Sequence, residues 1–76
     1  MIVYEIFSGV FSSVECGDYK SFGLIARWID EGREFIVDSI LDISTDEELV
    51  KSLCAYCNDR KIPPFSIGGI VEDFIG

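Results

Sequence analysis

The sequence predicts an α+β domain: a small, mostly antiparallel β-meander packed by one main α-helix at 45–60, with the C-terminal segment as an extra strand or a short helix. Three observations support this fold class. β-Branched and aromatic residues recur throughout residues 2–41, as they do in strands. A Glu-Gly pair at 31–32 can form a hairpin turn, and an amphipathic segment with helix-start signals follows it. With 76 residues, we expect a single domain spanning 1–76.

The N-terminal segment is predicted to be extended. Residues 2–7, IVYEIF, are rich in β-branched and aromatic side chains, and VFSSVE behind Gly9 continues the same character. Gly9 is therefore expected at a bulge or a turn. The Gly-Asp content of residues 15–19 indicates a turn. Two long strands with a bulge and three shorter strands fit this pattern equally well.

Residues 19–41 allow two interpretations. Apolar residues recur at helical spacing over 19–31, which suits an amphipathic helix in a β-α-β-α arrangement. A β-hairpin around Glu31-Gly32 explains more, because it also gives residues 33–41 a partner. The hairpin predicts these pairs: Asp30 with Arg33 as an ion pair, Trp28 with Phe35, Ala26 with Val37, Leu24 with Ser39, and Arg27 diagonally between Glu34 and Asp38. We favour the hairpin.

The main helix is predicted from both its ends and its apolar stripe. Thr45 with Glu48, or Ser44 with Glu47, forms a capping box at its start. Pro63-Pro64 ends it. The stripe comprises Leu49, Val50, Leu53, Cys54, Tyr56 and Cys57. The tail behind it is apolar at helical spacing, but Gly68-Gly69 also suits a bulged strand.

The two cysteines of LCAYC, residues 53–57, are spaced as in redox and metal motifs. A reactive thiol of such a motif lies at a helix N-terminus, whereas Cys54 lies about nine residues beyond the capping signal. A zinc site needs four ligands, and the chain has one more cysteine and no histidine. We interpret Cys54 and Cys57 as buried, apolar core residues.

The residue content argues against several classes of function. Without histidine the chain lacks the usual base of an acyl-transfer triad, and Gly68-Gly69 lacks the spacing and lysine of a phosphate loop. We expect no enzyme activity, no cofactor and no metal site. Scattered basic residues and a net charge of −8 oppose direct nucleic-acid binding. The N-terminus lacks a secretory signal and no apolar run suits a membrane span, so we expect a cytoplasmic protein.

The acidic surface is the remaining candidate for function. Fourteen acidic residues face only six basic ones, and such a field attracts basic proteins. A spaced array of carboxylates can imitate a nucleic-acid backbone in a basic groove; alternatively, the acidity serves only to keep a hydrophobic protein dispersed. We expect Glu34, Asp38 and Asp42 to share one face of the hairpin's second strand. The candidate partner-binding residues are Glu34, Asp38, Asp42, Asp46, Glu47, Glu48, Glu72 and Asp73.

Three short motifs resemble the ArdA-type antirestriction proteins. They are YKSFGLIARWID at 19–30, DEEL at 46–49 and EDF at 72–74. They cover about a third of the chain, and the match needs the insertion EGREFIVDSILDI. The matching residues are Tyr19, Gly23, Trp28, Ile29, Asp30, Glu47, Glu48, Leu49, Glu72 and Asp73. The resemblance implies an acidic DNA mimic that blocks restriction enzymes.

Together, charge, size and missing catalytic groups predict a stand-alone inhibitor of a basic, nucleic-acid-handling protein, such as a defence nuclease or a CRISPR effector. The alternative is a small assembly or immunity-type subunit that acts through apolar residues, with Trp28, Phe35, Tyr56 and Phe74 as candidates. A hydrophobic content of 49% exceeds what one small domain needs for its core, so a homodimer is also expected to be possible.

Overall fold

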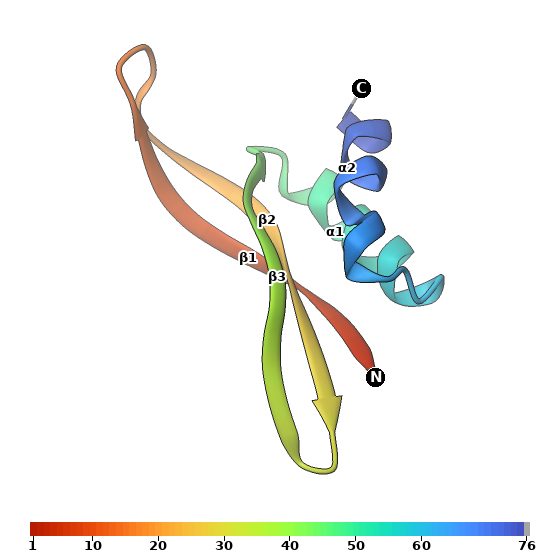
Figure 1. The fold of residues 1–76 in the computed structure, drawn as a ribbon. Helices are drawn as coiled ribbons and strands as arrows, with labels where there is room; N and C mark the ends of the chain where they lie inside the picture. Colours follow the sequence, from red (N-terminus) through yellow and green to blue (C-terminus); the bar gives the residue numbers. More distant parts are fainter. Residues whose placement is uncertain (76) are drawn as a thin grey trace.

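The computed structural model describes residues 1–75, which form a three-stranded antiparallel sheet followed by two helices (Figure 1). The elements are β1 (Ile2–Ser13), β2 (Gly17–Asp30), β3 (Arg33–Ser44), α1 (Glu47–Asp59), a 3₁₀ turn at Pro64–Ser66 and α2 (Ile67–Ile75). The strand order β1-β2-β3 is a meander, so the predicted α+β class is confirmed. The alternative helix at 19–31 is wrong, and the C-terminal segment is the short helix.

β1 and β2 form one long, unbroken hairpin. Their register runs without a shift from Ile2 opposite Trp28 to Ser13 opposite Gly17. Gly9 lies opposite Ser21 within this ladder, so the predicted bulge or turn at Gly9 is wrong. The glycine instead makes room for an aromatic ring, because a Cβ there would lie 2.9 Å from the ring of Phe7.

The β2–β3 hairpin turns at Glu31 and Gly32, as predicted. Both residues have positive φ, 49° and 80°, which is the conformation of a type I′ turn. Asp30–Arg33 and Trp28–Phe35 are confirmed as cross-strand neighbours in the register. Beyond them a bulge lies opposite the Ala26–Arg27 step, and Val37 has no partner in the register. The remaining predicted pairs are therefore wrong by one residue, since Ala26 faces Asp38 and Leu24 faces Ile40.

A second irregularity lies at Gly23. Leu24 faces Ile40 and Phe22 faces Ser44, so three residues of β3, 41–43, pass a single residue of β2. The backbone of β3 crosses close above Gly23: a Cβ there would overlap the carbonyl oxygen of Ile40 and lie 2.6 Å from the carbonyl carbon of Leu41. Only glycine fits this crossing.

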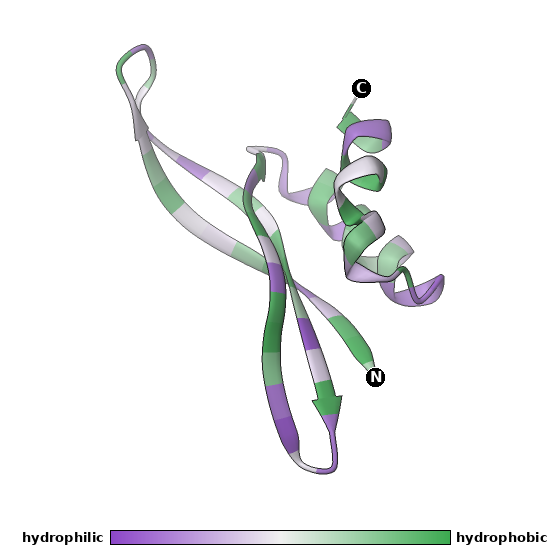
Figure 2. Cartoon of the chain, viewed as in Figure 1, coloured by the Kyte–Doolittle hydropathy of each residue, from purple (hydrophilic) through white to green (hydrophobic). Residues whose placement is uncertain are grey.

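Both helices cover the same side of the sheet, which we call the helix face; the other side is the open face (Figure 1). The core lies between the helices and the helix face of the sheet. It consists of Tyr4, Phe22, Leu24, Ala26, Val50, Leu53, Cys57, Ile67 and Val71. Burial of each large aliphatic side chain contributes roughly 1.5–3 kcal/mol. The helices cover only the middle of the sheet, and in Figure 2 hydrophobic segments continue along β1 and β3 beyond them.

The cap of α1 differs from both predicted capping boxes. Asp46 is the N-cap, and its Oδ1 accepts hydrogen bonds from the backbone N–H groups of Glu48 and Leu49 at 3.1 and 3.3 Å. Ser44 still belongs to β3, and its Oγ accepts from the Asp46 N–H at 3.0 Å. The helix therefore starts at Glu47, two residues later than predicted.

Candidate interaction surfaces

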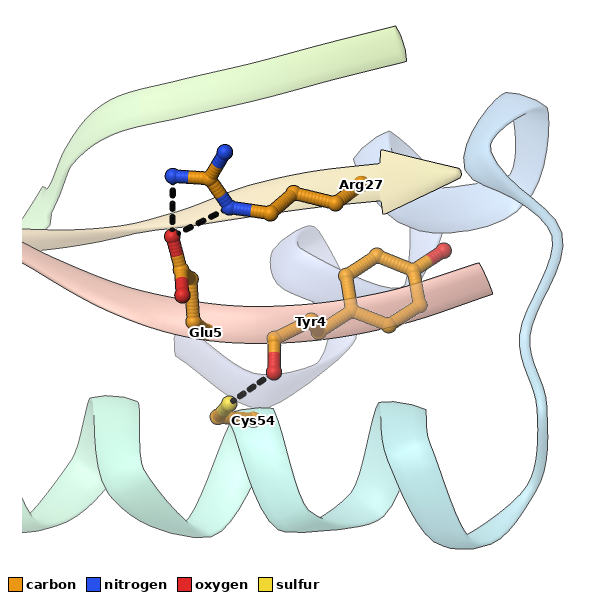
Figure 3. A network of polar contacts seen from close by, with 4 residues as sticks. All are labelled: Tyr4, Glu5, Arg27 and Cys54. Carbon is orange, nitrogen blue, oxygen red and sulfur yellow. Dashed lines mark hydrogen bonds and ion pairs between the residues drawn. The ribbon is translucent and has the colours of Figure 1, made fainter. Parts of the chain in front are cut away.

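Cys57 of α1 belongs to the core, as the sequence predicts, whereas Cys54 is only partly buried and packs against that core. Cys57 is fully buried, and the Sγ of Cys54 donates to the carbonyl oxygen of Tyr4 at 3.4 Å (Figure 3). Burial raises the pKa of both thiols, which disfavours the thiolate that redox chemistry and metal binding require. Cys16 is exposed in the β1–β2 turn. Within residues 1–75, no three Cys, Asp or Glu side chains gather closely enough to hold a metal ion.

The eight predicted carboxylate residues are all exposed, but the structure does not bring them to one face. Glu34 lies opposite Ile29, whereas Asp38 lies opposite Ala26. Paired residues share a face, and Ile29 and Ala26 are an odd number of residues apart, so their side chains point to opposite faces. Glu34 is on the open face and Asp38 on the helix face. The predicted common face is wrong because the bulge at Val37 inverts the alternation.

The side chain of Asp42 lies on the open face, as that of Glu34 does, and it is hydrogen-bonded to other residues of the sheet. Its two carboxylate oxygens accept hydrogen bonds from the hydroxyl of Ser21 and the phenol of Tyr19, both at 2.6 Å. Both bonds lower the pKa of the Asp42 carboxyl, and the bond from Ser21 has the larger effect. Asp42 therefore holds β3 against β2 at the Gly23 crossing.

The other predicted acids are on the helices. Asp46 caps α1, Glu47 and Glu48 occupy its first turn, and Glu48 lies 3.6 Å from Lys51. Such acids stabilise a helix start, so the fold gives them a structural role. Glu72 and Asp73 are exposed on α2, next to the buried Val71.

Arg27 pairs with a residue that the sequence prediction missed. Its guanidinium lies 2.6 Å from Glu5 of β1, on the open face (Figure 3), instead of between Glu34 and Asp38. The hydrogen bond to Glu5 raises the pKa of Arg27. Glu5 lies diagonally across from Arg27 in the β1–β2 register. This proximity depends on the pairing of the two strands and not on any local sequence pattern. In the described part of the chain Arg33 makes no ion pair within 4 Å, so the predicted bridge to Asp30 is absent.

The end of the β2–β3 hairpin carries an exposed aromatic pair. Trp28 and Phe35 face each other across the hairpin and are 41% and 52% exposed, because this end extends beyond both helices (Figure 1). Four exposed carboxylates lie on the same end of the hairpin: Asp30 and Asp38 on the face of the pair, Glu31 in the turn and Glu34 on the opposite face. We call this surface, formed by Trp28, Asp30, Glu31, Glu34, Phe35 and Asp38, the hairpin surface.

The sequence identified Trp28 and Phe35 as neighbours but not that the helices leave them exposed. The other two apolar candidates behave differently. The rings of Tyr56 and Phe74 pack edge to face at a centroid distance of 5.3 Å, and both residues are partly buried. They join α1 to α2 and leave Trp28 and Phe35 as the exposed aromatic residues of the four.

Comparison with known proteins gives no assignment: no family model, no curated protein and no solved structure matches this chain. Among the described residues, no helix combines the length and apolar content needed to cross a membrane.

Proposed function

We propose that this protein acts by binding, without catalysis, and that it inhibits a basic protein that handles nucleic acid, such as a restriction nuclease or a CRISPR effector. The observation that supports this proposal is the hairpin surface, in which an exposed aromatic pair and four exposed carboxylates share one end of the β2–β3 hairpin. A basic groove built for phosphates offers Arg and Lys side chains in excess. At Trp28 three strands lie side by side, with Ile2 of β1 on one side and Phe35 of β3 on the other, and only the tip at 30–33 projects as two strands.

The chemistry of the two sides is complementary. Arginine side chains stack on aromatic rings and pair with carboxylates, so Trp28 and Phe35 can serve as anchors while the carboxylates pair at the rim. Interfaces concentrate binding energy in buried aromatic residues surrounded by weaker polar contacts. The net charge of −8 steers the encounter and makes the association rate sensitive to salt.

The proposal limits the direct contact to the hairpin end. Glu34 and Asp38 remain contact residues, although they lie on opposite faces of β3, because a hairpin inserted into a groove presents both faces. Asp42, Asp46, Glu47, Glu48, Glu72 and Asp73 add to the long-range field. Since defence nucleases work in the cytoplasm, we place this protein there.

Inhibition assays against a panel of restriction nucleases and CRISPR effectors test the proposal. Reversing three hairpin charges, with Glu31→Lys, Glu34→Lys and Asp38→Lys, should abolish inhibition of the responsive enzyme. The matched control reverses three exposed charges elsewhere, Glu15, Asp59 and Glu72, and should retain most of it. Equal loss in both variants would show that net charge alone matters, and no loss in either would refute the role of the carboxylates.

A second candidate function, assembly through apolar residues, is supported by the exposed Trp28 and Phe35 themselves. The two functions differ in their response to salt. Binding to a basic groove should weaken steeply as salt rises, whereas apolar assembly should persist or strengthen. Trp28→Ala with Phe35→Ala should abolish both, so the salt series is the discriminating measurement.

A further inference from the structure

The outer edge of β1 carries backbone groups that point away from the sheet. Met1 exchanges both of its backbone hydrogen bonds with Ile29 of β2. Because bonding direction alternates along an antiparallel ladder, the odd-numbered residues of β1 bond to β2. The even-numbered residues direct their N–H and C=O groups outward.

One outward-facing residue is closed by α1. The side-chain oxygen of Asn58 accepts from the Tyr4 N–H at 2.7 Å, and its amide nitrogen donates to the Tyr4 carbonyl at 2.9 Å. The amide thus bonds to Tyr4 as a neighbouring strand would. Among residues 1–75, no such partner reaches the outward backbone groups of the next four even residues, Ile6, Ser8, Val10 and Ser12.

This open stretch lacks the features that protect natural sheet edges. Such edges carry charges, proline or bulges that prevent pairing with another chain. Residues 6–14, IFSGVFSSV, contain no charge and no proline, and their ladder to β2 has no bulge. The other edge, β3, has two register shifts and carries Glu34, Asp38 and Asp42. Only the β1 edge is therefore regular and neutral.

We propose that residues 6–12 of β1 pair antiparallel with the same segment of a second copy of this chain, with the two-fold axis at Gly9. In this register Ser8 bonds to Val10 of the second copy and Ile6 bonds to Ser12, which gives about eight inter-strand hydrogen bonds. Phe7 faces Phe11 of the second copy on the open face. The two form a non-hydrogen-bonded pair, in which the side chains lie closer together than in a hydrogen-bonded pair. The product is a continuous six-stranded sheet with all four helices on one face.

The neutral edge of β1 is the part of the molecule at which a second copy meets the least charge repulsion. Two chains at −8 repel each other wherever their carboxylates meet, and residues 6–14 form an uncharged stretch through which they can approach. The segment is also self-complementary, because every outward residue finds an outward residue opposite it. Asn58 ends the pairing on one side, at Tyr4.

Sedimentation equilibrium over a concentration series tests the proposal. The unmodified protein should dimerise, and Ser8→Pro should remain monomeric at every concentration. This proline removes an N–H that the monomer does not use, so the isolated fold should tolerate it. Ser8→Lys places a charge on the edge and should also abolish the dimer. Its control, Ser52→Lys on the exposed side of α1, raises the net charge equally and should dimerise as before.

Hydrogen exchange on the unmodified protein gives a readout that needs no variant. The amides of Ile6, Ser8, Val10 and Ser12 should exchange more slowly as the concentration rises, while the outward amides of Glu34 and Ile36 on β3 should not change. A protein that stays monomeric, or a dimer that persists in Ser8→Lys with unaltered exchange at these four amides, would overturn the proposal.

Discussion

The side-chain amide of Asn58 bonds to both backbone polar groups of Tyr4, accepting from its N–H at 2.7 Å and donating to its carbonyl at 2.9 Å. One helical side chain thereby attaches α1 to the edge of the sheet. The phenol of Tyr4 donates in turn to the carbonyl of Ile62, which follows the end of α1 in the sequence, at 2.5 Å. The N–H, carbonyl and hydroxyl groups of Tyr4 thus all form hydrogen bonds with the segment 58–62.

Asn58→Ala should lower the free energy of unfolding by about 1–3 kcal/mol, because it leaves the partly buried Tyr4 N–H without a partner and the Tyr4 carbonyl with only the weak Cys54 thiol donor. Asn58→Asp should cost more, since the carboxylate oxygen that replaces the amide nitrogen cannot donate to the Tyr4 carbonyl oxygen and repels it. Urea unfolding measures both variants. Asp59→Ala, a neighbouring exposed position, serves as the control and should change little.

Two glycines should respond to alanine in opposite ways. Gly23→Ala should unfold the protein or destabilise it by several kcal/mol, because its Cβ meets the backbone of β3. Gly68→Ala, in α2 with open space around it, should stabilise the protein by about 0.5–1 kcal/mol. Thermal unfolding followed by circular dichroism compares them. Equal effects of the two substitutions would contradict the β3 crossing.

Tyr4 should make the fold sensitive to alkaline pH. Burial, with smaller effects of Cys57 and Asp38, raises the pKa of Tyr4 to about 12, above the unfolded value of about 10. A raised folded pKa gives stability that is complete below pH ~10 and is lost as the pH rises toward about 12. Tyr4→Phe should be less stable by about 1 kcal/mol at neutral pH, and the difference should shrink over this range. A constant difference across alkaline unfolding curves would refute this assignment.

Asp42 should contribute to stability at neutral pH and lose that contribution in acid. Its folded pKa is lowered by Ser21 and Tyr19, so the contribution is present above the unfolded pKa of about 3.9 and disappears as the pH falls through the folded value. Asp42→Asn should be less stable than the unmodified protein at neutral pH. The two should converge in acid, as measured by chemical unfolding at each pH. A difference that persists at the acid end would contradict the prediction.

Glu31 occupies a backbone conformation that asparagine prefers. Its φ is 49°, and the following Gly32 has a φ of 80°, as in the Asn-Gly type I′ turn. Glu31→Asn should raise the free energy of unfolding by about 0.5 kcal/mol, because Asn adopts positive φ at lower cost. Glu15→Asn makes the same chemical change in the other turn, where φ is not positive. It should not reproduce the gain in urea midpoint.

The order and type of most elements can be predicted from local patterns of residues. The strands at 2–7 and 33–41, the turn at Glu31-Gly32 and the main helix follow from local patterns, namely β-branched residues, turn chemistry and helical spacing. The core position of Cys57 follows from the same helical stripe. Each of these features depends on residues that lie close together in the sequence. The sequence alone is therefore enough to predict them.

The face that each side chain occupies depends on how the strands and helices pack in the folded protein. Alternation along a strand predicts a common face for Glu34, Asp38 and Asp42, but the bulge at Val37 inverts it for Asp38. A second irregularity follows where β3 crosses Gly23, a glycine of another strand. The exposure of Trp28 and Phe35 likewise depends on where α1 and α2 end their cover of the sheet. These are contacts between segments distant in sequence, and their geometry depends on how strands and helices pack, which no local pattern encodes.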